Sequence, residues 1–361
     1  MSSGQTANGC CCAQATGRVC IGDKNMALTT VVPGRVWDFS HAVGRNAAVG
    51  TGFSQPAGLA VTSQGVTYVV SRGNENNFGS RISKVFIGGF YEEDLLGEFG
   101  FYGQKDGEII WPNSVAVDSQ GDVYVSDDWL NRISIFNGDG EFKTAWGTIG
   151  SGEGELDGPA GLAFDQNDHL YIVDSRNHRV QVFTKDGSYV SGFGSHGTGP
   201  GEFDTPWGIT IDREGAIYVA DWKNHRVQKF NADGRYAASF GSAVDLNHPS
   251  DVTVDPDGDV YVCDWGNNRV RIYDSAGEPL ASLVGDAQVL AKWAQAAVDA
   301  NPDMVKMRRR APSLEEEWRF CYPTGVDFDA EQSRLLVTDG QRGRIQIYIK
   351  DHDYLEPQMN L

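Results

Sequence analysis

The amino-acid sequence predicts an all-β fold built from six similar four-stranded antiparallel units. The first observation is composition: glycine supplies 44 of 361 residues, about 12%, against about 7% in ordinary chains. With 13 prolines and no Gly-X-Y period, this excess has to serve turns, and many turns imply many short strands. The second observation is a sequence line that recurs six times, and the third is a chain start that can supply one missing strand.

Each unit begins with a proline word that opens an apolar run. The six words read QPAGLAV from Gln55, WPNSVAVD from Trp111, GPAGLAFD from Gly158, TPWGITID from Thr205, HPSDVTVD from His248 and YPTGVDFD from Tyr322. A second apolar run, such as DVYVSD or AIYVAD, closes 15 residues after the proline in five units and 16 residues after it in the last. This pattern predicts two paired strands in every unit.

An Asp-x4-Arg word follows the second run in five of the six units. The pairs are Asp127 and Arg132, Asp174 and Arg179, Asp221 and Arg226, Asp264 and Arg269, and Asp339 and Arg344. In the first unit Ser71 replaces the aspartate, and a longer loop delays the basic residue to Arg81. A word that recurs in nearly every unit serves every unit, so we expect these ion pairs to be structural rather than catalytic.

A third and a fourth apolar run complete each unit, with polar turns such as TKDG and NADG between them. Six such meanders predict a six-bladed β-propeller of four-stranded blades. The last unit stops after its third run, whereas Val36–Gly44 has the offset of a fourth run, with 12 residues from Gly44 to Pro56. The N-terminal strand should therefore close the ring. The predicted domains are a disordered, cysteine-containing tail at 1–34, the propeller at 35–350 with a helical insertion at 286–320, and a tail at 351–361.

The line PWGITIDREGAIYVADWKNHRVQKF, which starts at Pro206, and its sister lines resemble NHL repeats over about residues 36–350. This resemblance implies the six-bladed propeller fold. It does not imply one activity, because propellers of this kind include lyases, ligand binders, RNA binders and interaction platforms.

Net charge and cysteine usage restrict the partners and the compartment. The formal charge of −19 argues against DNA, RNA and anionic membrane surfaces. No basic n-region with an apolar h-region opens the chain, and no apolar run is long enough for a membrane span. Four of the six cysteines lie at Cys10, Cys11, Cys12 and Cys20, which leaves only Cys263 and Cys321 for the folded part. This is too sparse for a disulfide framework, so we expect a reactive thiol tail in a cytoplasmic protein.

Aromatic residues gather in the loops that should share one face of the ring. They are Trp111, Trp129, Trp207, Trp222, Trp265 and Tyr322, with Asn113, Asp128, His248 and Asp251 beside them. Such rings can stack a ligand or bury side chains of a partner protein. The alternative is that they pack between neighbouring blades.

An insertion before the last unit breaks the regular spacing. Gly285 and Pro323 are 38 residues apart, where 12 is usual. Helical spacing around Trp293 predicts one helix that ends by Pro302, and Ser313 to Glu316 form a capping box for a second. Arg308, Arg309 and Arg310 concentrate positive charge between them. Because the insertion replaces a loop on the aromatic face, we expect it to lie over that face as a lid or a docking element.

The sequence predicts no metal and no cofactor. The peptide-amidating lyase, an NHL-type propeller, binds zinc through histidines that follow the blade prolines, whereas this chain has Ala57, Asn113, Ala160, Trp207, Ser250 and Thr324 there. Asp255, Asp257 and Asp259 alternate as calcium ligands do but lack an EF-hand loop. The predicted function is a rigid binding platform for a protein or small ligand. The alternative is a hydrolase or lyase at the central mouth, for which Asp251 and Asn113 are too few to assign a base.

Overall fold

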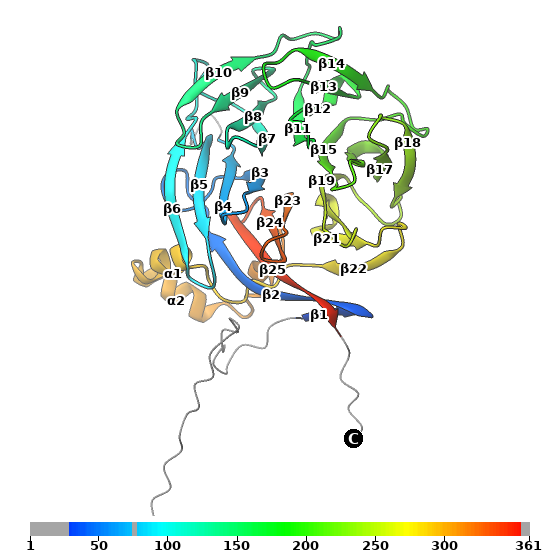
Figure 1. The fold of residues 1–361 in the computed structure, drawn as a ribbon. Helices are drawn as coiled ribbons and strands as arrows, with labels where there is room; N and C mark the ends of the chain where they lie inside the picture. The colour runs from blue at the N-terminus through cyan, green and yellow to red at the C-terminus, as the bar shows by residue number, and fades with distance from the viewer. Residues whose placement is uncertain (1–28, 74–77, 355–361) are drawn as a thin grey trace, which may run out of the picture.

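The computed structural model describes residues 29–73 and 78–354, and it contains six antiparallel sheets arranged in a ring around a central opening (Figure 1). Five sheets have four strands and the sixth has five. In each sheet the strand that starts at the blade proline lies innermost, and the following strands succeed it outward. The predicted six-bladed β-propeller is confirmed.

Blades 1 to 5 follow one another along the chain. Blade 1 contains β3 (Pro56–Val61), β4 (Val66–Ser71), β5 (Arg81–Ile87) and β6 (Glu93–Phe99). Blade 2 contains β7 (Pro112–Val117), β8 (Val123–Asp127), β9 (Arg132–Phe136) and β10 (Phe142–Trp146). Blade 3 contains β11 (Pro159–Phe164), β12 (Leu170–Asp174), β13 (Arg179–Phe183) and β14 (Tyr189–Phe193). Blade 4 contains β15 (Pro206–Ile211), β16 (Ile217–Asp221), β17 (Arg226–Phe230) and β18 (Tyr236–Phe240), and blade 5 contains β19 (Pro249–Val254), β20 (Val260–Asp264), β21 (Arg269–Tyr273) and β22 (Pro279–Leu283).

Blade 6 closes the ring with strands from both ends of the chain. It contains β23 (Pro323–Asp329), β24 (Arg334–Asp339), β25 (Arg344–Tyr354), then β2 (Gly34–Gly44) and β1 (Thr29–Val32). β2 pairs with β25 along its whole length, which confirms the predicted closure (Figure 1). β1 is a fifth strand within the segment expected to be tail. The cysteine cluster at 10–12 and residues 355–361 lie outside the described residues.

The hydrophobic core lies between the blades rather than in one central mass. One cluster joins Val227 and Phe240 of blade 4 to Val252 and Val262 of blade 5, and other junctions have similar clusters. The alternation of apolar side chains along each strand explains this arrangement, because both faces of an interior blade are covered by its neighbours. Cys263 in this core and Cys321 nearer the surface are free thiols.

The aspartate of the repeated word holds its own blade together. Asp221 is fully buried and accepts hydrogen bonds from the Asp204 amide (2.8 Å), the Asn224 amide group (2.9 Å) and the Arg226 guanidinium (2.9 Å). Arg226 also donates to backbone carbonyls of the loop that enters the blade. Blades 3, 5 and 6 repeat the aspartate–arginine pair. These contacts support the structural role expected for the word.

The residue before the arginine links one blade to the next. It accepts the backbone N–H of the residue that precedes the following blade's proline. The four links are Asn131 to Gly158 (2.8 Å), His178 to Thr205 (3.0 Å), His225 to His248 (3.1 Å) and Asn268 to Tyr322 (2.8 Å). The histidines at 178 and 225 therefore fill the same role as the asparagines.

The helical insertion lies on the outside of the ring, so its predicted place over the aromatic face is wrong (Figure 1). It forms α1 (Lys292–Asp299), α2 (Pro302–Arg310) and α3 (Glu315–Trp318). Trp293 is buried in a cluster with Val43 of β2 and Val85 of β5, and Lys292 Nζ donates to the Glu93 carbonyl of β6 (2.9 Å). The outer strand β2 leaves an apolar surface beside blade 1, and α1 covers it.

This placement changes the roles expected for residues of the insertion. Trp293 is only 8% exposed, so it belongs to the core and is unavailable to a partner. Arg308 is paired with Glu317, whereas Arg309 and Arg310 are exposed in the last turn of α2. That helix, which Asn301 caps, was not predicted. None of the helices in the described ranges is long and apolar enough to cross a membrane.

Candidate functional site

The candidate site is the end of the ring where the loops into the first strands meet the loops between the second and third strands. Three repeat positions supply its side chains: the residue before the blade proline, the residue after it, and the residue that follows the second strand. We call this cluster the aromatic mouth, and it comprises Arg72, Trp111, Asn113, Trp207, Trp222, His248, Trp265 and Tyr322.

Four rings form a continuous ladder across blades 4, 5 and 6. The ring centroids lie 4.5 Å apart for Trp207 and Trp222, 5.1 Å for Trp222 and Trp265, and 4.3 Å for Trp265 and Tyr322. All four side chains are half-buried. The ladder therefore combines the two roles considered for these residues, because it packs across blade junctions and keeps an accessible aromatic surface.

His248 extends the ladder on its outer side. Its ring centroid lies 5.0 Å from Trp222 and 4.6 Å from His225, and its Nδ1 lies 2.7 Å from Asn247 Oδ1. Burial and the neighbouring His225 lower the pKa of His248, which favours a neutral ring at neutral pH. Trp129, by contrast, is 67% exposed, and no ring contact within the described residues joins it to the ladder.

Arg72 is the member of the mouth that sequence reasoning missed. Its guanidinium carbon lies 5.3 Å from the ring centroid of Trp111 and 5.6 Å from that of Trp207. Nε donates to the Pro112 carbonyl (3.0 Å) and Nη2 to Asn113 Oδ1. Burial lowers the pKa of Arg72 to about 10, although Asp128 and Asp127 act to raise it. The available signal was the irregular first unit, where Ser71 directly precedes this arginine.

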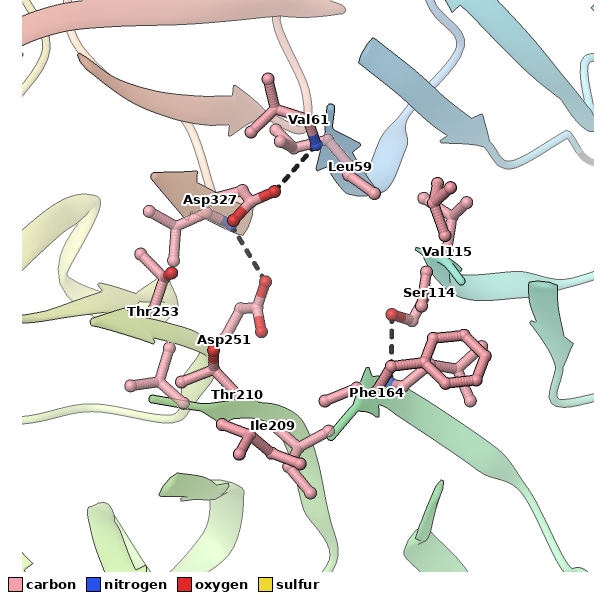
Figure 2. Close-up of a pocket in the computed structure, with 18 residues that line it drawn as sticks. Leu59, Val61, Ser114, Val115, Phe164, Ile209, Thr210, Asp251, Thr253 and Asp327 are labelled. Carbon is pink, nitrogen blue, oxygen red and sulfur yellow. Dashed lines mark hydrogen bonds between the residues drawn. The ribbon is translucent and has the colours of Figure 1, made fainter. Parts of the chain in front are cut away.

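Beneath the mouth, the first strands of all six blades line an axial cavity of about 220 Å³ (Figure 2). Asp251 and Asp327 project into it. Asp251 Oδ2 accepts the Val326 amide (3.0 Å), and Asp327 Oδ2 accepts the Val61 amide (2.8 Å), so each carboxylate bonds to the next blade. Remoteness from bulk solvent raises the pKa of Asp251 to about 7 and that of Asp327 to about 6.

Glycines explain why so few side chains enter the upper part of this cavity. The repeat position of Asp251 is glycine in four other blades, and a Cβ there would lie within 3.0 Å of a neighbouring blade's backbone, as at Gly58, Gly161, Gly208 and Gly325. Only Ser114 and Asp251 place a polar side chain at this level. Ser114 Oγ accepts the Leu162 amide of the next blade (3.3 Å).

On the face opposite the mouth, three aspartates surround the side chain of a buried lysine. The buried ammonium of Lys350 contacts Asp255, Asp257 (2.8 Å) and Asp259 (2.8 Å). Arg35 Nε lies 2.6 Å from Asp259 Oδ2. These contacts tie β25 and β2 of blade 6 to blade 5, so the alternating carboxylates stabilise the closed ring.

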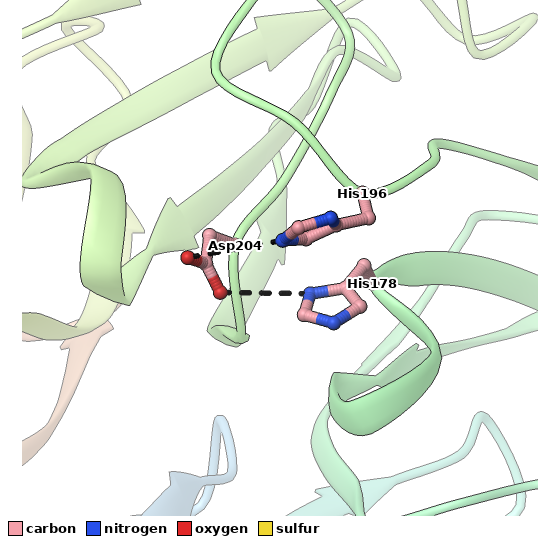
Figure 3. Close-up of side chains that lie close together, drawn as sticks. All are labelled: His178, His196 and Asp204. Atoms are coloured by element: carbon pink, nitrogen blue, oxygen red, sulfur yellow. Dashed lines mark ion pairs between the residues drawn. The ribbon is translucent and has the colours of Figure 1, made fainter.

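His178, His196 and Asp204 form the one group of three potential metal ligands within 4.8 Å of one another in the part of the chain that the structure describes (Figure 3). The lone pair of His178 Nδ1 already accepts the Thr205 amide (3.0 Å). Asp204 accepts the Thr205 hydroxyl (3.0 Å) and lies 3.5 Å from Lys223 Nζ. Because a metal would have to displace these bonds, we assign the group to the junction of blades 3 and 4.

Known families match the repeated region. A family described as "6-bladed beta-propeller" matches residues 161–247, and the NHL repeat matches residues 246–273. No curated protein matches the sequence.

Solved structures match most of the chain at low sequence identity. A catalytically inactive virginiamycin B lyase from Staphylococcus aureus, solved with quinupristin, is 15% identical, with 89% of this chain and 93% of that chain covered and a TM-score of 0.52. A Bacteroides thetaiotaomicron protein of unknown function is 18% identical, with 88% and 76% covered and a TM-score of 0.58. A streptogramin B lyase is 12% identical, with 88% and 98% covered and a TM-score of 0.51. At these identities the likeness concerns the fold alone: the chain is a six-bladed β-propeller, and its residues 246–273 match the NHL repeat.

Proposed function

We propose that this propeller is a binding platform whose aromatic mouth takes a ligand with flat apolar groups, either a small molecule or side chains of a partner protein. The observation that carries the proposal is the half-exposed ladder from Trp207 to Tyr322, in which neighbouring centroids are no more than 5.1 Å apart. Aromatic pairs contribute about 0.5–1.5 kcal/mol beyond their buried area, so several rings can hold one ligand.

Rigidity supports this use of the mouth. The links from His178, His225 and Asn268 hold the loops that carry the ladder. A site with fixed side chains loses little conformational entropy when it binds, which favours affinity. The cytoplasmic location, and any partner for Arg309 and Arg310 at the outer rim, stay predictions.

The test uses 2-naphthamide, a neutral flat probe, and ligand-detected NMR. We expect Trp222→Ala to weaken probe binding at least tenfold, since Trp222 contacts both Trp207 and Trp265. Trp129→Ala is the matched control because Trp129 lies outside the ladder, and it should leave binding unchanged. A probe that binds neither protein, or that binds the Trp222 variant as well as the parent, would overturn the proposal.

A lyase or hydrolase at the same mouth is the second candidate. Asp251 favours it, because a carboxyl group with a pKa of about 7 is poised to transfer protons near neutral pH. Quinupristin, named with one of the similar lyases, is the first compound to incubate with the protein. Conversion seen by mass spectrometry and abolished by Asp251→Asn would support this activity, and intact quinupristin would count against it.

A further inference from the structure

Among the described residues, Arg72 lacks the carboxylate partner that the arginine of the Asp-x4-Arg word has in blades 3 to 6. Arg226, Arg269 and Arg344 each contact an aspartate carboxylate within 2.9 Å. No carboxylate oxygen among the described residues forms an ion pair with Arg72. The two acids that influence it are already engaged: Asp127 accepts backbone amides such as that of Ile110, and Asp128 pairs with Arg176.

The position of the guanidinium makes this charge available to the mouth. Trp111 and Trp207 belong to blades 2 and 4, which are not neighbours, so a group within 5.6 Å of both ring centroids lies across the opening. Nε and Nη2 are used by the Pro112 carbonyl and Asn113, whereas Nη1 has no acceptor among the described residues. One N–H edge of the guanidinium thus remains to be satisfied.

An unpaired, partly desolvated cation is costly unless an anion approaches it. Burial lowers the pKa of Arg72 to about 10, so the side chain still carries its charge at neutral pH. The stacked indole rings hold the guanidinium in place through cation–π contacts. The chain has a net charge of −19, so a fixed positive charge inside the aromatic mouth contrasts with the rest of the protein. The negative charge of a bound ligand would neutralise it.

We propose that Arg72 makes the aromatic mouth selective for aromatic carboxylates, with the planar ring on the tryptophan ladder and the carboxylate on the free edge of the guanidinium. This inference rests on the proposed binding function and narrows its ligand class. Guanidinium matches a planar carboxylate with paired N–H donors, which a lysine ammonium does not. Arg72 is therefore a specificity-determining residue rather than a structural one.

The experiment compares 2-naphthoate with 2-naphthamide, which have the same ring and differ in charge. Calorimetry should find naphthoate bound at least tenfold more tightly by the parent protein. Arg72→Met should weaken naphthoate at least tenfold and change naphthamide less than twofold. Arg72→Gln, which keeps a donor for the Pro112 carbonyl, should give the same result if the methionine variant is poorly folded.

Lys223→Met is the matched control, because Lys223 is a cation of the same face that is paired with Asp204. It should preserve the naphthoate preference. Equal binding of the two probes by the parent protein, or an unchanged preference in both Arg72 variants, would overturn the carboxylate selectivity and leave the aromatic platform standing. Failure of both probes to bind would overturn the platform itself.

Discussion

Blades 4 and 1 use the same repeat position for different purposes. In blade 4 the second strand ends in Asp221, which is buried and binds Arg226, and Trp222 follows it into the mouth. In blade 1 Ser71 replaces the aspartate, and its hydroxyl accepts only a long bond from the Ser54 amide (3.3 Å). The delayed Arg81 takes the structural role, pairing with Glu98 and donating to the Ala48 carbonyl (2.7 Å).

The difference shows how a repeat protein obtains a site without losing its framework. Where the Asp-x4-Arg word is intact, its aspartate and arginine are engaged in hydrogen bonds within the blade and its entry loop. Where the word is broken, a second arginine becomes available, and Arg72 reaches the mouth while Arg81 remains 1% exposed. α1 also packs beside blade 1, at its junction with β2 of blade 6. A departure from the repeat can therefore add a functional residue, here Arg72, to a site that the repeat positions already supply with aromatic rings.

The largest effect is expected from removing the aspartate of an intact word. Asp221→Ala leaves Arg226 and the Asp204 amide without their partner in a buried setting, and breaking a buried pair costs about 3–5 kcal/mol. Urea unfolding measures the loss. Asp233→Ala, which removes an exposed pair with Arg235 in the same blade, is the control and should leave stability unchanged. Equal effects of the two variants would remove the distinction between framework and surface charges.

The contact between blade 1 and the insertion should be weakened by Trp293→Ala. Removing a buried tryptophan costs about 3–5 kcal/mol in a core, and here the loss should appear first as release of α1 and α2. Trypsin should cleave after Arg309 or Arg310 at least tenfold faster than in the parent protein. Binding of 2-naphthamide should not change, because the insertion lies away from the mouth. Reduced probe binding would show that the insertion contributes to the aromatic mouth.

Replacing a buried aspartate by asparagine should change the melting temperature in opposite directions, depending on whether the carboxylate has an arginine partner. Burial holds the pKa of Asp251 at about 7, above its ordinary 3.8, so the folded protein retains a proton that the unfolded chain loses. Its contribution to stability is full below pH 4 and is lost as the pH rises to 7. Asp251→Asn should therefore raise the melting temperature at pH 8 by about 2–4 °C and have little effect near pH 4.

Asp221→Asn is the counterpart, since Asp221 has the Arg226 partner that Asp251 lacks. It should lower the melting temperature at pH 8. The same sign for both amide variants would show that an arginine partner does not decide the outcome.

The smallest effect on stability is expected at Arg72. Arg72→Met removes two cation–π contacts and two hydrogen bonds, but it also removes an unpaired charge from a partly desolvated site. The terms oppose each other, and we expect a change below about 1 kcal/mol in urea unfolding. A loss comparable to that of Asp221→Ala would place Arg72 in the framework.

Repetition made the fold predictable from the sequence. Six proline words with nearly constant spacing fixed the blades, and the offset from Gly44 to Pro56 predicted the closing strand. β1 was missed because Thr29–Val32 has no equivalent in any repeat. The position of the insertion was not predictable from the loop that it replaces. It depends on the apolar face of α1, because Trp293 packs against buried side chains that include Val43 of β2.

The candidate site was predictable only in part. The aromatic residues share repeat positions, so their common face could be inferred before the ring contacts were known. Arg72 escaped because it belongs to the irregular unit, and its two tryptophan neighbours lie 39 and 135 positions further along the chain. The raised pKa of Asp251 depends on enclosure by six separate strands, which no local pattern encodes.

The strand β2 ties the order of synthesis to the order of folding. Among the described strands, β2 is the second to be synthesised and its sheet partner β25 is the last, with Gly44 opposite Arg344. Such a long sequence separation makes pairing slow. A nascent chain with five completed blades would still present unpaired strand edges on both sides of the gap, a configuration prone to association with other chains. The growing protein therefore has most need of chaperone protection in the interval before β25 becomes available to pair with β2.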